Sequence, residues 1–142
     1  MNQAQKLWEI DQIRNLKARY FRFMDTKQWE AWGDLFTEDC VLQYGGGPKA
    51  VLHGRTAIVD FVRSALDSLV SCHHGHMPEI ELLSDTTASG IIAMEDTLES
   101  KDGSKNFLLN GFGHYHEEYA KGADGKWRIK SSKLTRLIVR TE

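Results

Sequence analysis

The chain has 142 residues, of which 41% are hydrophobic, and its 18 basic and 20 acidic residues leave a formal charge of −2. This length predicts a single domain that spans residues 1–142, and the apolar content excludes a disordered chain. The two signs of charge are mixed along the sequence, so neither a nucleic-acid surface nor an acidic tail is expected.

The N-terminal segment predicts a long helix. From about residue 5 to residue 25, apolar side chains recur at helical spacing with charges between them. The opening MNQAQKLWEIDQI lacks the apolar core of a signal peptide, and the longest apolar run of the chain is too short to span a bilayer. Two cysteines without CxxC spacing favour a reducing compartment. We therefore expect a cytoplasmic protein that does not enter membranes.

Two shorter helices and one extended segment are expected next. A short helix is predicted for residues 28–36, where aromatic residues share one face. Residues 40–44 are β-like, and the following GGGP run breaks the strand. A third helix begins at Gly54 and carries an apolar stripe as far as Leu69.

The second half of the chain predicts an antiparallel meander. Two Asp-Gly turns separate segments rich in alternating or β-branched residues, which is a strong hairpin signal. Strands are expected at about 72–83, 87–99, 105–120 and 126–139. Strands of this length curl, so the helices are expected to fill the concave side of the sheet. The predicted class is α+β, with N-terminal helices packed in the concave face of a curved, mostly antiparallel sheet around a small-molecule pocket.

The segment SCHHGHMP, residues 71–78, carries three of the six histidines. Side chains alternate along a strand, so His73 is expected to point into the cone while His74 and His76 point outward. An inward His beside a carboxylate has the makeup of a general base, because the carboxylate holds one ring nitrogen and leaves the other free. The other interpretation of His73 is a buried imidazole that donates to a backbone carbonyl.

The outward histidines leave a metal site open as an alternative. His74 and His76 form an i, i+2 pair, and His114 and His116 form a second pair in another strand. Four imidazoles from two neighbouring strands suit zinc or another divalent ion. Histidines on a wet outer face are also common without any metal, and we predict no metal ligands here. No other cofactor is predicted, since no GxGxxG motif follows a strand.

Other polar residues are candidates for the same site as His73. Asp25 falls where the first helix ends, and it either caps the next helix or is held near the pocket. Asp96 ends an apolar strand face, so it either reaches solvent or lies in the pocket. Tyr115, in the next strand, is either a pocket hydroxyl or a core residue.

Together these residues resemble the SnoaL-like branch of the NTF2-like superfamily along nearly the whole chain. The resemblance rests on five motifs in order: IxxLxxxYxxxMD from residue 13, WxxW followed by LFxxD from residue 29, GRxxI from residue 54, HHGHMPEI from residue 73 and DGKWRI from residue 124. Within that superfamily the chain is similar to the dehydratase-type enzymes, namely scytalone dehydratase, bile-acid 7α-dehydratase and lindane dehydrochlorinase.

For the site, the resemblance implies a dyad in which an Asp from the end of the first helix orients a strand His. The pattern of the bile-acid dehydratases falls on five positions of this chain: Tyr20, Asp25, His73, Asp96 and Arg136. It implies His73 as the base and Asp25 as its partner, with Tyr20 donating to a substrate oxygen.

Arg136 does not fit simple alternation along the last strand. Trp127 and Ile129 are expected to face the core, which turns Arg136 outward. Arg136 reaches the pocket only if a bulge, expected at Ser131 and Ser132, shifts the alternation.

The expected function is a cofactor-independent, dehydratase-like or isomerase-like reaction on a small molecule with an apolar body. Four further residues are expected to contact this substrate: Tyr115, Met94, Phe61 and Met77. The competing class is a non-catalytic ligand carrier or accessory subunit, in which Phe107, Leu109 and Met94 fill the interior against His73. A partly apolar outer face predicts a homodimer or homotrimer.

Overall fold

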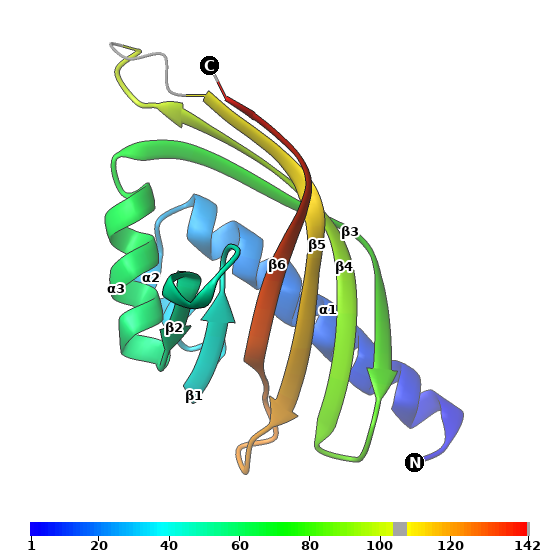
Figure 1. Cartoon of the computed structure of the whole chain (residues 1–142). Helices are drawn as coiled ribbons and strands as arrows, with labels where there is room; N and C mark the ends of the chain where they lie inside the picture. Colours follow the sequence, from blue (N-terminus) through cyan, green and yellow to red (C-terminus); the bar gives the residue numbers. More distant parts are fainter. Residues whose placement is uncertain (104–107, 142) are drawn as a thin grey trace.

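The computed structural model describes residues 1–103 and 108–141, which form helices on one side of a long curved sheet (Figure 1). The helices are α1 (Gln3–Asp25), α2 (Trp29–Gly33) and α3 (Arg55–Leu66), with a short 3-10 turn, η1 (Pro48–Ala50). The strands are β1 (Phe36–Gln43), β2 (Val51–His53), β3 (Leu69–Leu82), β4 (Thr87–Ser100), β5 (Leu108–Lys121) and β6 (Trp127–Thr141).

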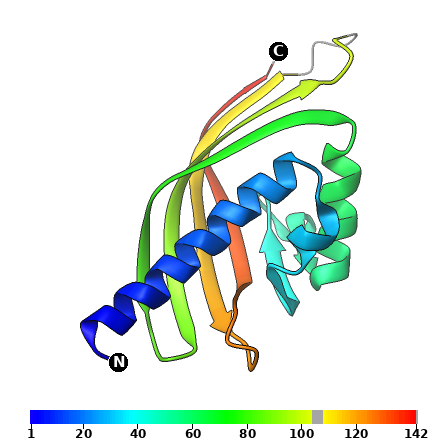
Figure 2. The ribbon, with the colours of Figure 1, turned by 180° about the vertical axis from the view of Figure 1, so that it is seen from behind.

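The six strands form one sheet in the order β2-β1-β6-β5-β4-β3. Every neighbouring pair is antiparallel except β1 and β6, which run parallel. Helix α1 crosses the concave side of the meander, while α2 and α3 lie beside the short strands β1 and β2 (Figure 2). The α+β prediction of helices packed in the hollow of a curved, mostly antiparallel sheet is therefore confirmed.

Helix α1 is long because its start is capped and one of its faces is buried. The Asn2 side chain accepts from the Gln5 backbone N–H, and the Gln5 side chain accepts from the Asn2 backbone N–H, which forms a capping box. Its buried face consists of residues three or four positions apart: Ile13, Leu16, Lys17, Tyr20 and Met24. This face directs Tyr20 into the concave side of the sheet, where the helix ends at Asp25.

The main differences from the predicted elements lie around β1. The short helix ends at Gly33, so Phe36 begins a strand instead of ending a helix. The reason is tertiary: Phe36, Cys40 and Leu42 are buried, and β1 pairs with β6. The Asp124-Gly125 turn joins β5 and β6 as predicted, with Gly125 at φ 79°. The start of the strand predicted from residue 105 lies outside the described residues, in which β5 begins at Leu108.

The described helices are too short or too polar to cross a bilayer.

Candidate active site

The structure brings Asp25 and His73 together on the concave side of the sheet. Asp25 Oδ1 lies 2.7 Å from His73 Nδ1, and Asp25 Oδ2 accepts the His73 backbone N–H at 2.7 Å. The imidazole is 8% exposed and the carboxylate 19% exposed. An ionised carboxylate can only accept, so Nδ1 carries the hydrogen and Nε2 keeps a free lone pair. The pair therefore has the arrangement of a general base and its orienting group.

Asp25 is held at an unfavourable place on its helix. It is the last residue of α1, where a negative charge meets the negative end of the helix dipole. Three donors offset this: the backbone N–H and Nδ1–H of His73, and the hydroxyl of Ser71 at 2.9 Å. The N-cap position of α2 is occupied by Gln28, so Asp25 does not cap the following helix.

Asp96 and Arg136 form an ion pair on the other side of the His73 ring. Asp96 lies directly opposite His73 in the β3–β4 register, and its Oδ2 is 3.6 Å from His73 Nε2. Arg136 donates from both terminal nitrogens, at 2.6 and 2.9 Å, to the two oxygens of Asp96. These bonds raise the pKa of Arg136 above its ordinary value, while partial burial opposes the rise. Two-pronged pairing of this kind fixes both groups in one plane.

A bulge in β6 turns Arg136 inward. Ile129 pairs with Tyr119 and Ser131 pairs with Glu118, so Lys130 is an extra residue on β6. The buried side chains change from odd to even positions after it, and Ser132 is buried. The expected bulge is present, one residue earlier than at Ser131 and Ser132. Arg136 consequently reaches Asp96, with 28% of its side chain exposed.

Gly111 leaves space for the ion pair. It lies opposite Asp96 in the β4–β5 register. A Cβ at Gly111 would lie 2.1 Å from Arg136 Nη1 and 2.6 Å from Asp96 Oδ1. The absence of a side chain at Gly111 therefore lets Asp96 and Arg136 meet, although the backbone angles of Gly111 do not require glycine.

Tyr20 and Tyr115 lie together in the interior beside these charges. Their ring centroids are 5.9 Å apart, and both residues are buried. Burial is the main cause that raises the pKa of each tyrosine above its ordinary value. Both hydroxyls thus stay protonated, so they can donate hydrogen bonds.

The chain also buries an ion pair that the sequence analysis did not predict. Lys17 Nζ lies 3.0 Å from Glu117 Oε2 and 3.6 Å from the centroid of the Tyr20 ring. The carboxylate also accepts from the hydroxyls of Tyr119 and Ser132. Lys17 belongs to the apolar stripe of α1, and a charged residue inside such a stripe was the available signal. Burial lowers the pKa of Lys17, and Glu117 opposes this.

Met94 and Phe61, which were expected to contact the substrate, lie in different surroundings. Met94 is buried, and its sulfur lies 3.8 Å from Arg136 Nη1, so it borders the ion pair. Phe61 is partly exposed on α3, where its ring stacks on Tyr44 at 4.6 Å.

The expectation that Met77 lines the interior needs correction. Its side chain is 91% exposed. The register of β3 shifts between His76 and Glu79, and Met77 has φ 40°, so this edge-strand bulge carries the side chain away from the sheet. Phe107, one of the three residues expected to fill the interior in the carrier interpretation, lies outside the described residues.

A family model of the SnoaL-like domain matches residues 5–133. The chain belongs to the SnoaL-like family. Its fold is that of the NTF2-like proteins, and solved structures of a proposed scytalone dehydratase and of dehydrochlorinases share this fold.

Solved structures with the same fold are similar to this SnoaL-like protein over nearly its whole length. A proposed scytalone dehydratase from Novosphingobium aromaticivorans is 20% identical, with a TM-score of 0.89 over 99% of this chain and 92% of that one. A hexachlorocyclohexane dehydrochlorinase from Novosphingobium barchaimii is 17% identical, with a TM-score of 0.84 over 99% and 94%. A protein of unknown function from Mycobacterium tuberculosis is 30% identical, with a TM-score of 0.80 over 96% and 77%.

The outer histidines of this SnoaL-like protein do not have the arrangement that the alternative of a shared metal site requires. His74 and His76 are exposed, as expected, but β4 separates their strand from that of His114 and His116. The two histidine pairs are therefore about 10 Å apart, which is two strand spacings, whereas each nitrogen bound to a zinc ion lies about 2 Å from it. Within residues 1–103 and 108–141, no group of three or more His, Cys, Asp and Glu could hold a metal ion.

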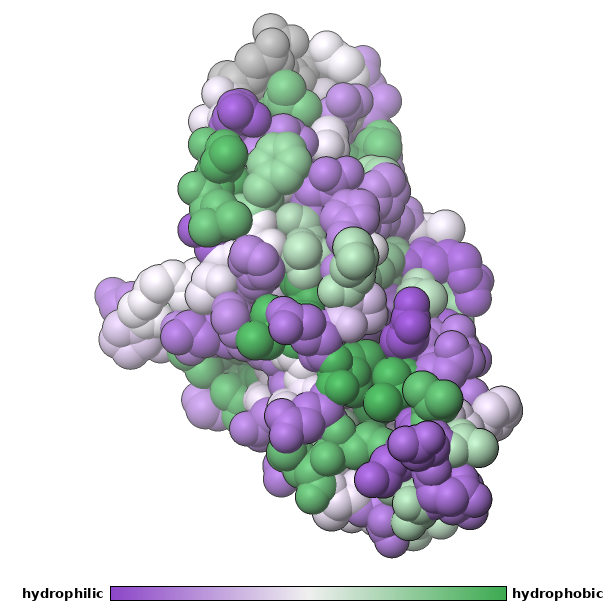
Figure 3. All heavy atoms as spheres, turned by 90° about the vertical axis from the view of Figure 1, so that its right-hand side faces the viewer, coloured by the Kyte–Doolittle hydropathy of each residue, from purple (hydrophilic) through white to green (hydrophobic). Residues whose placement is uncertain are grey.

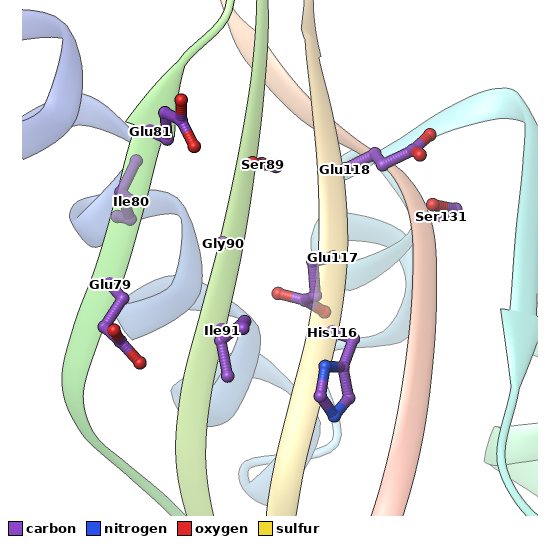
Figure 4. Close-up of a pocket in the computed structure, with 10 residues that line it drawn as sticks. All are labelled: Glu79, Ile80, Glu81, Ser89, Gly90, Ile91, His116, Glu117, Glu118 and Ser131. Atoms are coloured by element: carbon purple, nitrogen blue, oxygen red, sulfur yellow. The ribbon is translucent and has the colours of Figure 1, made fainter.

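One hollow among the described residues lies on the outer face of the sheet, away from the dyad. It has a volume of about 560 Å³ and takes its walls from β3, β4, β5 and β6, including Glu79, Ile91, His116 and Glu118 (Figure 4). Seen from the side of β3, the surface carries hydrophobic patches between hydrophilic side chains (Figure 3). In the described residues, His73 and Asp25 line neither this hollow nor the one of about 540 Å³ beside α1 and α2.

Proposed function

We propose that this SnoaL-like protein is a cofactor-independent lyase or isomerase that removes a proton from a carbon atom next to a carbonyl group. The observation that carries the proposal is the 2.7 Å contact between Asp25 Oδ1 and His73 Nδ1, which leaves His73 Nε2 as the free base. Asp25 and Arg136 are both partly exposed, so solvent reaches the two ends of the site. The likeness to proteins named as a dehydratase and a dehydrochlorinase supports an elimination.

In a dehydration, His73 Nε2 takes the proton from the α-carbon of a β-hydroxy carbonyl compound. The electron pair of that C–H bond forms the new C=C bond as the C–O bond to the β-hydroxyl breaks. The departing hydroxide takes the proton back from the imidazolium, so one water leaves and His73 returns to its neutral form. Asp25 stabilises the imidazolium between the two transfers.

Four groups would act on the oxygens of such a substrate. The Tyr20 and Tyr115 hydroxyls stay protonated and share a hydrogen bond, and one of them would donate to the carbonyl oxygen as charge develops on it. Arg136 would assist through N–H groups that Asp96 does not occupy, and Asp96 would position the leaving hydroxyl near Nε2. Because Asp96 already neutralises Arg136, the site favours an uncharged substrate with an apolar body.

The proposal is tested with a panel of uncharged β-hydroxy ketones that carry aryl or alkyl bodies. Dehydration yields a conjugated enone, which absorbance follows directly. We expect wild-type protein to convert at least one member, and His73→Ala and Asp25→Asn to lower kcat by roughly three to four orders of magnitude. Turnover that is the same in wild type and both variants would refute the dyad assignment.

A carrier or accessory subunit is the second candidate function, favoured by the position of two hollows away from His73. It predicts saturable binding of an uncharged apolar ligand without conversion, and equal affinity in His73→Ala.

We also propose that the protein is a homodimer or homotrimer that associates through the outer face of the sheet. Val70, Ile91 and Ile138 are exposed there or at its edge. Light scattering on a sizing column gives the mass directly, and a monomer at micromolar concentration would contradict this.

A further inference from the structure

A serine and a lysine behind Asp25 form a chain of hydrogen bonds that ends at the dyad. Lys27 Nζ donates to Ser71 Oγ at 2.8 Å, and the Ser71 hydroxyl donates to Asp25 Oδ1 at 2.9 Å. The same Oδ1 accepts from His73 Nδ1 at 2.7 Å. A hydroxyl has one hydrogen, so Ser71 can accept from the ammonium and donate to the carboxylate at the same time. Every donor in the chain therefore points toward Asp25.

The position of Lys27 is specified by the end of α1. Lys27 has φ 61°, in the left-handed region that residues other than glycine rarely adopt. Its backbone N–H donates to the Met24 carbonyl, and that of Gln28 donates to the Phe23 carbonyl, which closes the helix. This turn returns the chain beside β3, so the side chain of Lys27 lies against Ser71 instead of extending into solvent. A strained residue that also makes a specific contact suggests a role for its side chain.

The ammonium of Lys27 is partly removed from water. Burial lowers the pKa of Lys27, and the negative charge of Asp25 opposes this. Its other charged neighbours are Lys101, whose ammonium donates to the Asp67 carbonyl, and Asp67 itself. On the far side of the His73 ring, Asp96 and Arg136 neutralise each other. Lys27 is thus a cation that acts on Asp25 through the Ser71 hydroxyl.

We propose that Ser71 and Lys27 are positioning residues for the Asp25–His73 dyad. They hold the Asp25 carboxylate in the rotation that receives Nδ1–H, and this keeps Nε2 as the nitrogen without a hydrogen. The ammonium polarises the serine hydroxyl, which strengthens the bond that the hydroxyl donates. The expected effect on turnover rests on the proposed function, whereas the expected effect on the orientation of the His73 ring does not.

The experiment is proton NMR of the hydrogen on His73 Nδ1, which a short bond to a carboxylate shifts far downfield and protects from solvent exchange. Asp25→Asn identifies the signal by removing it. We expect Ser71→Ala and Lys27→Met to speed its exchange with water at least tenfold, while Ser71→Thr and Lys27→Arg keep it close to the wild-type rate. An exchange rate in Ser71→Ala and Lys27→Met equal to that of wild type would overturn the proposal.

Two further variants separate positioning from folding and from general charge. Lys27→Gly removes the ammonium and also relieves the backbone strain, so it should unfold at the same or higher urea concentration and still lose protection of the signal. Lys101→Met removes a neighbouring positive charge outside the chain of hydrogen bonds and should leave the signal unchanged. Protection retained in Lys27→Gly, or lost in Lys101→Met, would contradict the assignment.

Activity gives a separate readout with any ketone from the panel that is converted. Ser71→Ala should lower kcat roughly tenfold with little change in KM, and Ser71→Thr should restore it. If no ketone is converted while the NMR signal responds as described, the lyase proposal fails and the positioning of the ring by Ser71 and Lys27 stands.

Discussion

Gly111→Ala separates the Asp96–Arg136 pair without removing either charge. The added Cβ would meet Arg136 Nη1 at 2.1 Å, and opening this to an ordinary contact of 3.4 Å moves the guanidinium by about 1.3 Å. The displaced atom is at the end of a flexible side chain, so the backbone need not move. Losing charged hydrogen bonds costs about 1.5–3 kcal/mol, and replacing a strand glycine by alanine returns about 0.5–1 kcal/mol. We therefore expect a net loss of about 1–2 kcal/mol.

Urea unfolding of Gly111→Ala, compared with two control variants, measures this loss. Within the described residues nothing lies within 4 Å of a Cβ at Gly46, so Gly46→Ala should be near neutral. A Cβ at Gly113 would lie 1.9 Å from the backbone oxygen of Thr135, so Gly113→Ala should cost more than Gly111→Ala. A crystal structure of Gly111→Ala should show Arg136 turned away from Asp96. Wild-type stability together with an intact Asp96–Arg136 pair would show that the added Cβ does not displace the guanidinium.

Three other predictions concern buried groups. Lys17→Met leaves Glu117 buried without its counter-ion and should lower the free energy of unfolding by about 3–5 kcal/mol. The double variant Lys17→Met with Glu117→Gln should recover part of this lost stability in the same urea assay. Cys72 is exposed, whereas Cys40 is buried and burial raises the pKa of the Cys40 thiol to about 12. A thiol reagent at pH 8 should therefore label one cysteine in the native chain and two in urea. Labelling of both cysteines in the native chain would contradict the packing around β1. Burial also raises the pKa of three tyrosines, so the folded state keeps protons that the unfolded state loses above pH about 10. The contribution of these groups, Tyr20, Tyr115 and Tyr119, should be complete below that pH. Stability should fall above pH about 10.5, where the opposite effect of the lowered Lys17 pKa has ended, and an unchanged urea midpoint at pH 11 would contradict this.

Local periodicity was sufficient to predict which side chains of the long helix and strands face inward. The helical stripe of α1 placed Tyr20 inward and Asp25 at the helix end, and strand alternation placed His73 inward and His74 outward. These assignments depend only on the repeat of each element, which the side-chain pattern carries. The order of the hairpins likewise puts β4 between β3 and β5, so the wide separation of the two histidine pairs could have been deduced.

Interruptions of the repeat were harder to predict. The bulge at Lys130 was expected only because Arg136 otherwise faced outward, and the bulge that exposes Met77 was not foreseen. Bulges depend on how one strand pairs with its neighbour, and alternation within a single strand carries no such signal. The contact between Lys27 and Ser71 joins residues 44 positions apart and depends on the turn after α1, which the sequence pattern does not specify.

A crystal structure with a bound, uncharged enone or its saturated ketone analogue would show most directly whether His73 acts on a substrate. The ligand should lie on the concave side of the sheet, with its reacting carbon within about 3.5 Å of His73 Nε2. Its carbonyl oxygen should accept from Tyr20, Tyr115 or Arg136. A ligand bound only in the outer hollow beside Glu79 and His116, with side chains filling the space next to His73, would contradict this role of His73.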